Sequence, residues 1–147
     1  MPSAVLTSFL AGQHRELDRL LEAADNESGT PQALQAFVRF REAMEHHLGL
    51  EERLLFPSLE ACMGPGGPLV VMRDEHDAIR DLLQQGYEAL GAQELKAYRQ
   101  VLDTLTVLVQ QHHLKEENVL YPMGDTLLSD RAETLLQTMI EAPGVHG

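Results

Sequence analysis

One pattern is written twice in this chain, and it constrains the fold more than any other feature. The stretch HHLGLEERLLFP occupies residues 46–57, and QHHLKEENVLYP occupies residues 111–122, 65 residues further along. When the two prolines are aligned, both stretches read His-x-x-x-Glu-Glu-x-x-Leu-aromatic-Pro. A chain that repeats such a polar pattern is predicted to place both copies at equivalent positions of a repeated structural unit.

The apolar residues around the two copies recur with a helical period. Loops are indicated by the polar, glycine- and proline-containing stretches 26–31 and 63–68, and by a shorter break at Gly91. These breaks divide the chain into four long helical segments, and a fifth, shorter helix is predicted from about residue 130 to 141. No stretch shows strand-like alternation of useful length, so the predicted class is all-α.

The first and third helical segments also resemble each other. His14 precedes a Leu-Leu pair at 20–21, as His76 precedes one at 82–83. The first helix therefore corresponds to the third, and the second to the fourth. Four long helices joined by short loops pack most simply as an antiparallel up-down-up-down four-helix bundle, here with a short C-terminal helix.

Length and charge narrow the classes of function. The chain has 147 residues and a net charge of −12, which repels phosphate backbones and anionic lipid, so neither nucleic acid nor membrane is an expected partner. The sequence has no apolar run long enough to span a membrane, and its N-terminus is a poor secretory signal, so we expect a cytoplasmic protein. The length fits a single domain over residues 1–147, with a core at about 5–140.

The histidine content points toward metal. The chain has seven His against 11 Lys plus Arg. The single cysteine, Cys62, rules out a disulfide within the chain and a cysteine-only metal site. His146 lies in the C-terminal tail, and no role is expected for it.

The repeated motif predicts a cluster of polar side chains inside the bundle. In each copy the His and the first Glu are four residues apart, so both lie on one face of a helix. The histidines of the first and third helices fall within apolar stripes and should also point inward. Four histidines and two carboxylates are therefore predicted to converge from all four helices: His14, His47, Glu51, His76, His112 and Glu116.

Two buried carboxylates without partners would be very costly, and a pair of cations resolves this problem. Each Glu can bridge two metals while the imidazoles complete each metal's shell. Mixed imidazole and carboxylate ligation suits iron, manganese or zinc. The alternative is a bundle without metal whose core carries six polar residues.

The register of the second motif is open, because His113 with Glu117 is also four residues apart. The proline alignment favours the pair His112 and Glu116. Adjacent helical residues differ by about 100°, so only one of each pair is expected to be fully inward. His113 and His46 are then flanking residues; the alternative is that they bind metal or orient a residue that does.

Four further side chains lie near the predicted cluster. Arg80, one turn after His76, either orients a carboxylate or an incoming anion, or reaches the bundle edge and pairs with acidic neighbours. Asp18 either accepts a hydrogen bond from His14 or has a surface role. Tyr87 and Tyr121 are expected in core packing, with a redox or hydrogen-bonding role as the alternative.

Together these residues resemble the hemerythrin-like (HHE, cation-binding) family. Its pattern places one His, or one His-x-x-x-Glu, on each helix in turn, and the match covers about residues 5–140. The stretch GPLVVMRDEH at 67–76 also resembles the start of that family's third helix. The resemblance implies a non-heme di-iron centre bridged by Glu51, Glu116 and an oxo or hydroxo group, with the four histidines as terminal ligands.

One departure affects the expected function. Oxygen-carrying hemerythrins are similar but have a further His four residues after the histidine of the third helix, where this chain has Arg80. One fewer imidazole leaves a coordination position for water or substrate. The resemblance therefore implies binding of, or reaction with, O2, NO or H2O2 for sensing, storage or detoxification.

Three alternatives to this function remain. One is a di-iron enzyme, either a peroxidase or a nitric oxide reductase. Another is iron donation or iron–sulfur repair, although this sequence shows no counterpart of the N-terminal cysteine-bearing domain that the repair proteins carry. The third is an interaction module with zinc or no metal. The sequence leaves monomer and homodimer equally open.

Overall fold

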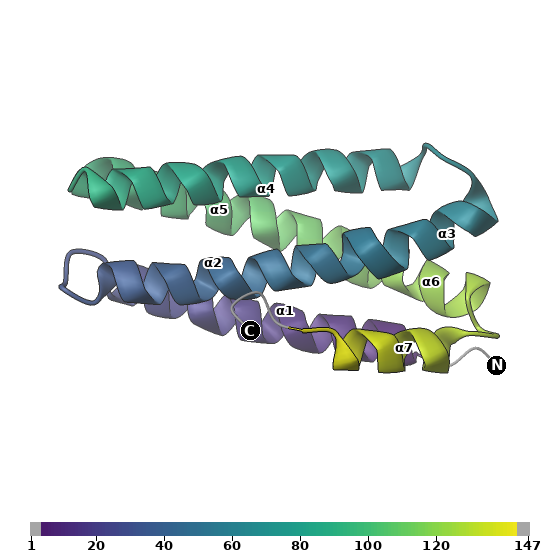
Figure 1. Cartoon of the computed structure of the whole chain (residues 1–147). Helices are drawn as coiled ribbons and strands as arrows, with labels where there is room; N and C mark the ends of the chain where they lie inside the picture. The colour runs from purple at the N-terminus through teal and green to yellow at the C-terminus, as the bar shows by residue number, and fades with distance from the viewer. Residues whose placement is uncertain (1–3, 144–147) are drawn as a thin grey trace.

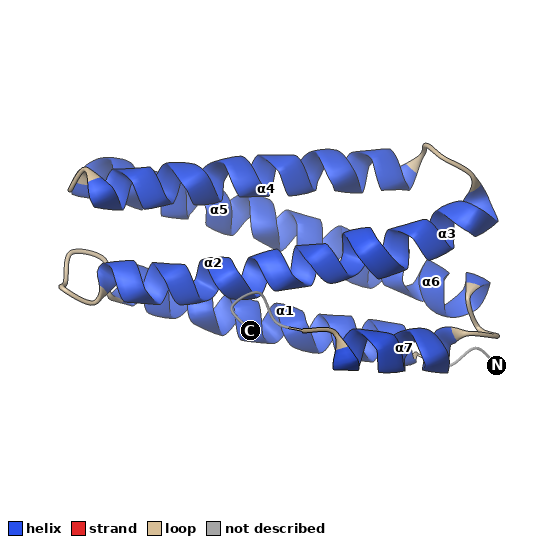
Figure 2. Ribbon diagram, in the orientation of Figure 1, coloured by secondary structure: helices blue, strands red, loops and turns tan. Residues whose placement is uncertain are grey.

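The computed structural model describes residues 4–143, so His146 lies outside the described residues. This part of the chain is all helical and has no strand (Figure 2), as predicted. Seven α-helices and two five-residue π-helical segments follow one another in this order: α1 (Val5–Asn26), α2 (Ala33–Leu50), η1 (Glu51–Leu55), α3 (Phe56–Met63), α4 (Pro68–Gly91), α5 (Leu95–Lys115), η2 (Glu116–Leu120), α6 (Tyr121–Leu127) and α7 (Ala132–Glu141).

The four long helices α1, α2, α4 and α5 lie side by side (Figure 1). The α1–α2 and α4–α5 loops lie at one end of the molecule, and the α3–α4 loop lies at the other. The predicted short C-terminal helix is α7, which packs against α1. No helix in the described part of the chain has the length and apolar character required to cross a membrane.

The apolar core is divided into two clusters along the bundle. One cluster lies at the end formed by α3, α6, α7 and the start of α1, and includes Leu10 and Met72. The other lies toward the α1–α2 and α4–α5 loops and includes Leu17 and Ile79. The predicted polar residues His14 and His76 fall between these positions, so the core has a polar layer in the middle.

The two π-helical segments begin at the first glutamate of each copy of the repeated motif. In each segment the backbone closes hydrogen bonds over five residues, as from Phe56 N–H to the carbonyl of Glu51. Pro57 has no N–H to donate, and its ring would press on the carbonyl four residues earlier in a regular α-helix, so the wider turn accommodates it. Pro122 stands at the same place after η2. The two prolines therefore do not end the helical path, which continues as α3 and α6.

The N-terminus of α1 is held by Asp125 of α6. The buried carboxylate accepts hydrogen bonds from Leu6 N–H at 2.9 Å and from Thr7 N–H and hydroxyl at 3.0 and 2.7 Å. These backbone groups have no partner within the helix, so Asp125 caps α1 from a distant part of the sequence.

Candidate metal centre

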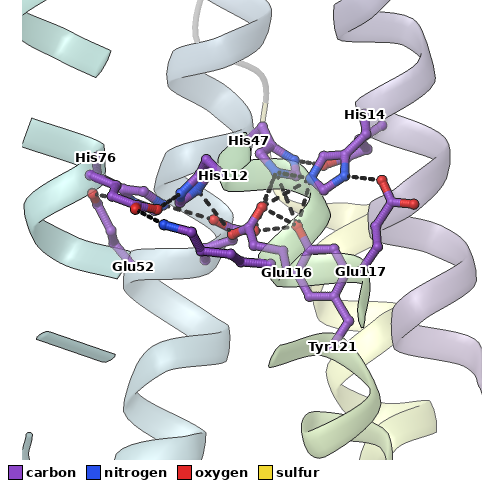
Figure 3. A network of polar contacts seen from close by, with 12 residues as sticks. His14, His47, Glu52, His76, His112, Glu116, Glu117 and Tyr121 are labelled. Carbon is purple, nitrogen blue, oxygen red and sulfur yellow. Dashed lines mark hydrogen bonds and ion pairs between the residues drawn. The ribbon is translucent and has the colours of Figure 1, made fainter. Parts of the chain in front are cut away.

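The six predicted residues come together in the polar layer, and Figure 3 labels five of them, all except Glu51. α1 supplies one histidine, α4 another, and each copy of the motif supplies a histidine and the glutamate that begins its π-helical segment. All six residues are at most 1% exposed: His14, His47, Glu51, His76, His112 and Glu116.

One half of the cluster joins α4 and α5 to the two glutamates. His76 Nε2 lies 2.9 Å from Glu51 Oε1, and His112 Nε2 lies 3.2 Å from Glu116 Oε2. One ligand atom from each of these four residues lies within 4.8 Å of the others. None of the four atoms named above has a hydrogen-bond partner among the described residues. Four converging buried atoms of this kind suit a cation, because nitrogen and carboxylate oxygen are ligands for divalent metals.

The other half joins α1 and α2 to the same two glutamates. His14 Nε2 lies 3.0 Å from Glu116 Oε1 and 3.2 Å from His47 Nε2, which in turn lies 3.2 Å from Glu51 Oε2. Each glutamate thus turns one oxygen toward each half of the cluster. This is the arrangement that bridging of two metals requires.

Each of the four histidines is oriented by an acceptor on its outer nitrogen. The pairs, with distances of 2.7 to 2.8 Å from Nδ1, are His14 with Glu117, His47 with Gln13, His76 with Glu52, and His112 with Glu75. A carbonyl or carboxylate oxygen can only accept, so each Nδ1–H donates and each Nε2 is left with its lone pair toward the centre. The register is therefore Glu116 inside and Glu117 outside.

The electrostatics of the cluster favour positive charge. Burial alone would lower the pKa of His47, but the carboxylates of Glu51 and Glu116 outweigh it and raise the pKa to about 10. Burial is likewise outweighed at His76, mainly by Glu51 and Glu52, so its pKa rises to about 9. The shifts reflect the negative potential of the buried glutamates, and the same potential suits a metal cation in place of the protons on Nε2.

Tyr121 belongs to this centre, contrary to the expectation of core packing alone. Its side chain is fully buried, and its single hydroxyl proton has two carboxylate acceptors within reach, Glu51 Oε2 and, at 3.0 Å, Glu116 Oε1. The hydroxyl oxygen of Tyr121 also lies 2.9 Å from His14 Nε2. Burial, reinforced by the charges of Glu116 and Glu51, raises the pKa of Tyr121 well above its ordinary value, so the phenol keeps its proton.

His113 is also inside, and the expectation that it only flanks the site is wrong. The ring is 5% exposed and stacks on His14, with 3.5 Å between centroids and 10° between planes. A helix of a bundle has neighbours on two sides, so His112 faces α4 while His113 faces α1, and both are buried. Burial, with the nearby His14 and His47, lowers the pKa of His113 to about 2 and keeps the ring neutral.

The remaining candidates lie outside the cluster. Arg80 pairs with Glu45 at 3.1 Å and Glu52 at 2.6 Å, as the acidic-neighbour alternative predicted. Asp18 is exposed, and Glu117 takes the hydrogen bond of His14 that was considered for it. Tyr87 is 45% exposed rather than in the core. His46 is half-buried and belongs to neither group of potential ligands.

Comparison with protein families agrees with this geometry. The hemerythrin HHE cation binding domain matches residues 5–123, with a second, overlapping match over residues 67–142. No curated protein and no solved structure matches the chain. The family matches cover the four helices that supply the buried histidines and glutamates. The chain therefore belongs to the hemerythrin HHE cation-binding domain family.

Proposed function

We propose that this chain is a non-heme di-iron protein that binds or reacts with small oxidants or gases, namely O2, NO or H2O2, for sensing, storage or detoxification. The observation that carries the proposal is the set of four buried ligand atoms without hydrogen bonds on His76, His112, Glu51 and Glu116. Manganese and zinc are the alternatives to iron, because the same ligand types accept them.

The proposed ligands divide into two terminal pairs and two bridges. His14 and His47 would hold one ion, His76 and His112 the other, and the two glutamates would hold both. Such a pair of irons would supply redox chemistry with small oxidants. The alternation of loops between the two ends of the molecule (Figure 1) supports an antiparallel up-down-up-down bundle as the frame.

The protein's own residues would control access and protons. The apolar clusters on both sides of the polar layer exclude bulk water. A surface pocket whose wall includes Glu52 and Arg80 lies beside the His76 half, and Glu52 contacts His76 directly. We take this pocket as the side from which a small reactant approaches. The Tyr121 hydroxyl holds a proton between the two glutamates.

Metal content and absorption test the proposal directly. Purified protein should contain two irons per chain and show charge-transfer absorption of a bridged ferric pair. A long-lived spectral change with O2 or NO supports a binder. Two zincs, or a colourless protein that keeps its fold under chelation, would refute the di-iron function and support an interaction module instead.

A di-iron enzyme is the second candidate, and the position of Tyr121 favours it. A phenol hydrogen-bonded to both proposed bridges can give up or take back a proton during turnover. Repeated consumption of peroxide by the iron-loaded protein would support an enzyme, and we expect Tyr121→Phe to slow it without lowering the iron content. A single stoichiometric reaction followed by bleaching would exclude catalytic turnover.

A further inference from the structure

The residues that accept hydrogen bonds from Nδ1 of the four histidines form the outer shell of the centre. Two of them follow the same internal repeat as the proposed ligands. The residue after each proposed bridge binds the histidine of the opposite hairpin: Glu52 binds His76 of α4, and Glu117 binds His14 of α1. The repeat would make the two halves of the centre equivalent if every such pair of positions carried the same residue type.

Three pairs of repeat positions break this equivalence. Alignment of the two copies sets Leu48 against His113 and Phe56 against Tyr121, and alignment of α1 with α4 sets Gln13 against Glu75. His113 and Tyr121 both contact His14, and Gln13 contacts His47. Two extra polar rings, His113 and Tyr121, therefore lie at the His14–His47 half of the centre, where the neutral Gln13 also takes the place that the charged Glu75 has in the other half.

Of the three pairs, His113 and Leu48 differ most in their capacity to bind metal. One of its ring nitrogens lies within 4.8 Å of the ligand atoms of His14, His47 and Glu116, and Nε2 is buried without a hydrogen-bond partner. Leu48, at the equivalent repeat position, is buried in the apolar core. The His76–His112 half thus has no third imidazole.

The outer shells differ in charge as well. Arg80 pairs with Glu52, and Lys115 pairs with Glu75, so both carboxylates behind the His76–His112 half are neutralised by cations. The equivalent repeat positions carry Asp18 and Leu50. In the described part of the chain no Lys or Arg forms an ion pair with Glu117.

We propose that the two metal positions are chemically different and that His113 sets the difference, as a third imidazole beside His14 and His47. The inference rests on the proposed two-metal centre. The position with three imidazoles retains a divalent metal more firmly than the position with two. Three metal–nitrogen bonds must break before the metal leaves the first position, and only two before it leaves the second. Metal should therefore leave the protein in two steps.

The test is the release of Fe²⁺ from the full chain, loaded without oxygen and mixed with excess colour-forming ferrous chelator. The wild type should release two irons per chain in two phases of equal amplitude. In His113→Leu, which installs the residue found at the repeat position, the slow phase should accelerate about tenfold or more while the fast phase keeps its rate. His46→Gln, which makes the corresponding exchange at the neighbouring histidine, is the control and should leave both phases unchanged.

The outcomes separate this inference from the function on which it rests. Release of two irons in a single phase by the wild type would overturn the inequivalence, and two unchanged phases in His113→Leu would overturn the role of His113 in setting it. Either result would leave the di-iron proposal standing. Fewer than two irons bound by the wild type would overturn both. His113→Phe keeps a ring against His14 without a nitrogen, so it replaces the Leu variant if that variant does not fold by circular dichroism, and the same acceleration is expected.

Discussion

The carboxylate of Glu52 lies 2.8 Å from Nδ1 of His76 and joins that histidine to Arg80 on the bundle surface. Burial opposes ionisation of Glu52, but His76 and Arg80 outweigh it and lower its pKa to about 2. Glu52 is therefore ionised at neutral pH and orients the ring of His76 with a full charge.

This relationship makes Glu52→Gln a sensitive test of the outer shell. The amide still accepts a hydrogen bond but carries no charge, so we expect metal affinity to fall about tenfold or more. Competition with a chelator of known affinity measures the change. Glu45→Gln is the matched control, since Glu45 also pairs with Arg80 but touches no histidine of the cluster. An equal loss in both variants would assign the effect to Arg80 rather than to His76.

Glu51→Ala and Glu116→Ala should each remove most of the bound metal. Each glutamate has one oxygen toward each half of the centre, so its loss affects both positions. Metal per chain after desalting is the measurement. Glu117→Ala is the adjacent control and should keep two metals at saturation, because Glu117 contacts only the outer nitrogen of His14. Retention of two metals in Glu51→Ala or Glu116→Ala would disprove the bridging role.

Asp125→Ala should destabilise the fold by about 1–2 kcal/mol, the usual effect of removing a helix N-cap. The carboxylate accepts two backbone hydrogen bonds at the start of α1, and alanine would leave these N–H groups without a partner. Urea unfolding of the protein at fixed metal loading measures the change. Asp130→Ala, at an exposed position, should change the free energy of unfolding by no more than about 0.5 kcal/mol. Equal effects would contradict the capping role.

Gly86→Ala and Gly12→Ala should have opposite effects on stability. A Cβ at Gly86 would lie 2.7 Å from Cζ of the buried Phe37 ring, so the substitution should destabilise by about 1–3 kcal/mol. A Cβ at Gly12 meets nothing within 4 Å, and alanine there should raise stability by up to about 1 kcal/mol through helix propensity. Thermal unfolding of both variants is the measurement. Destabilisation by Gly12→Ala would contradict the expected gain from helix propensity, and unchanged stability in Gly86→Ala would contradict the predicted clash with Phe37.

Tyr98→Phe should change how stability depends on pH. Burial, with the charge of Asp25, raises the pKa of Tyr98 to about 12. The unfolded phenol ionises near its ordinary pKa of 10, so wild-type stability is intact below pH 10 and falls as pH rises toward 12. The variant lacks this part of the fall, and its advantage over the wild type should grow between pH 9 and 11.

At pH 7 the Tyr98→Phe variant should be no less stable than the wild type, because the buried hydroxyl has no hydrogen-bond partner among the described residues. Urea unfolding at each pH is the measurement, and Tyr87→Phe is the control at an exposed phenol. A constant difference between Tyr98→Phe and the wild type across this pH range would contradict the prediction.

The convergence of the six candidate ligands was predictable because helical spacing of four residues is a local property. His47 with Glu51 and His112 with Glu116 each share one helix face, and the aligned prolines chose the register that the structure has. Arg80 was predictable as a surface ion pair for the same reason, since acidic residues surround it in sequence and in space.

Tyr121 could not be placed from a regular helix. It follows Glu116 by five residues, which in an α-helix leaves the two side chains about 140° apart. The π-helical segment Glu116–Leu120 has a wider turn and brings them to the same side. Proline six residues after each glutamate was the available signal. His113 was missed because one inward direction was assigned to a helix that is covered on two sides.

The divided core has a consequence for how the molecule opens. The apolar residues form two separate clusters on either side of a polar layer, so we expect each cluster to lose its packing independently of the other. Amide hydrogens of α6 and α7 then exchange with solvent as one group, and those around the α1–α2 and α4–α5 loops as another. Metal bound by the six candidate ligands would join all four long helices at the polar layer. We expect this link to couple the two groups into a single cooperative unit.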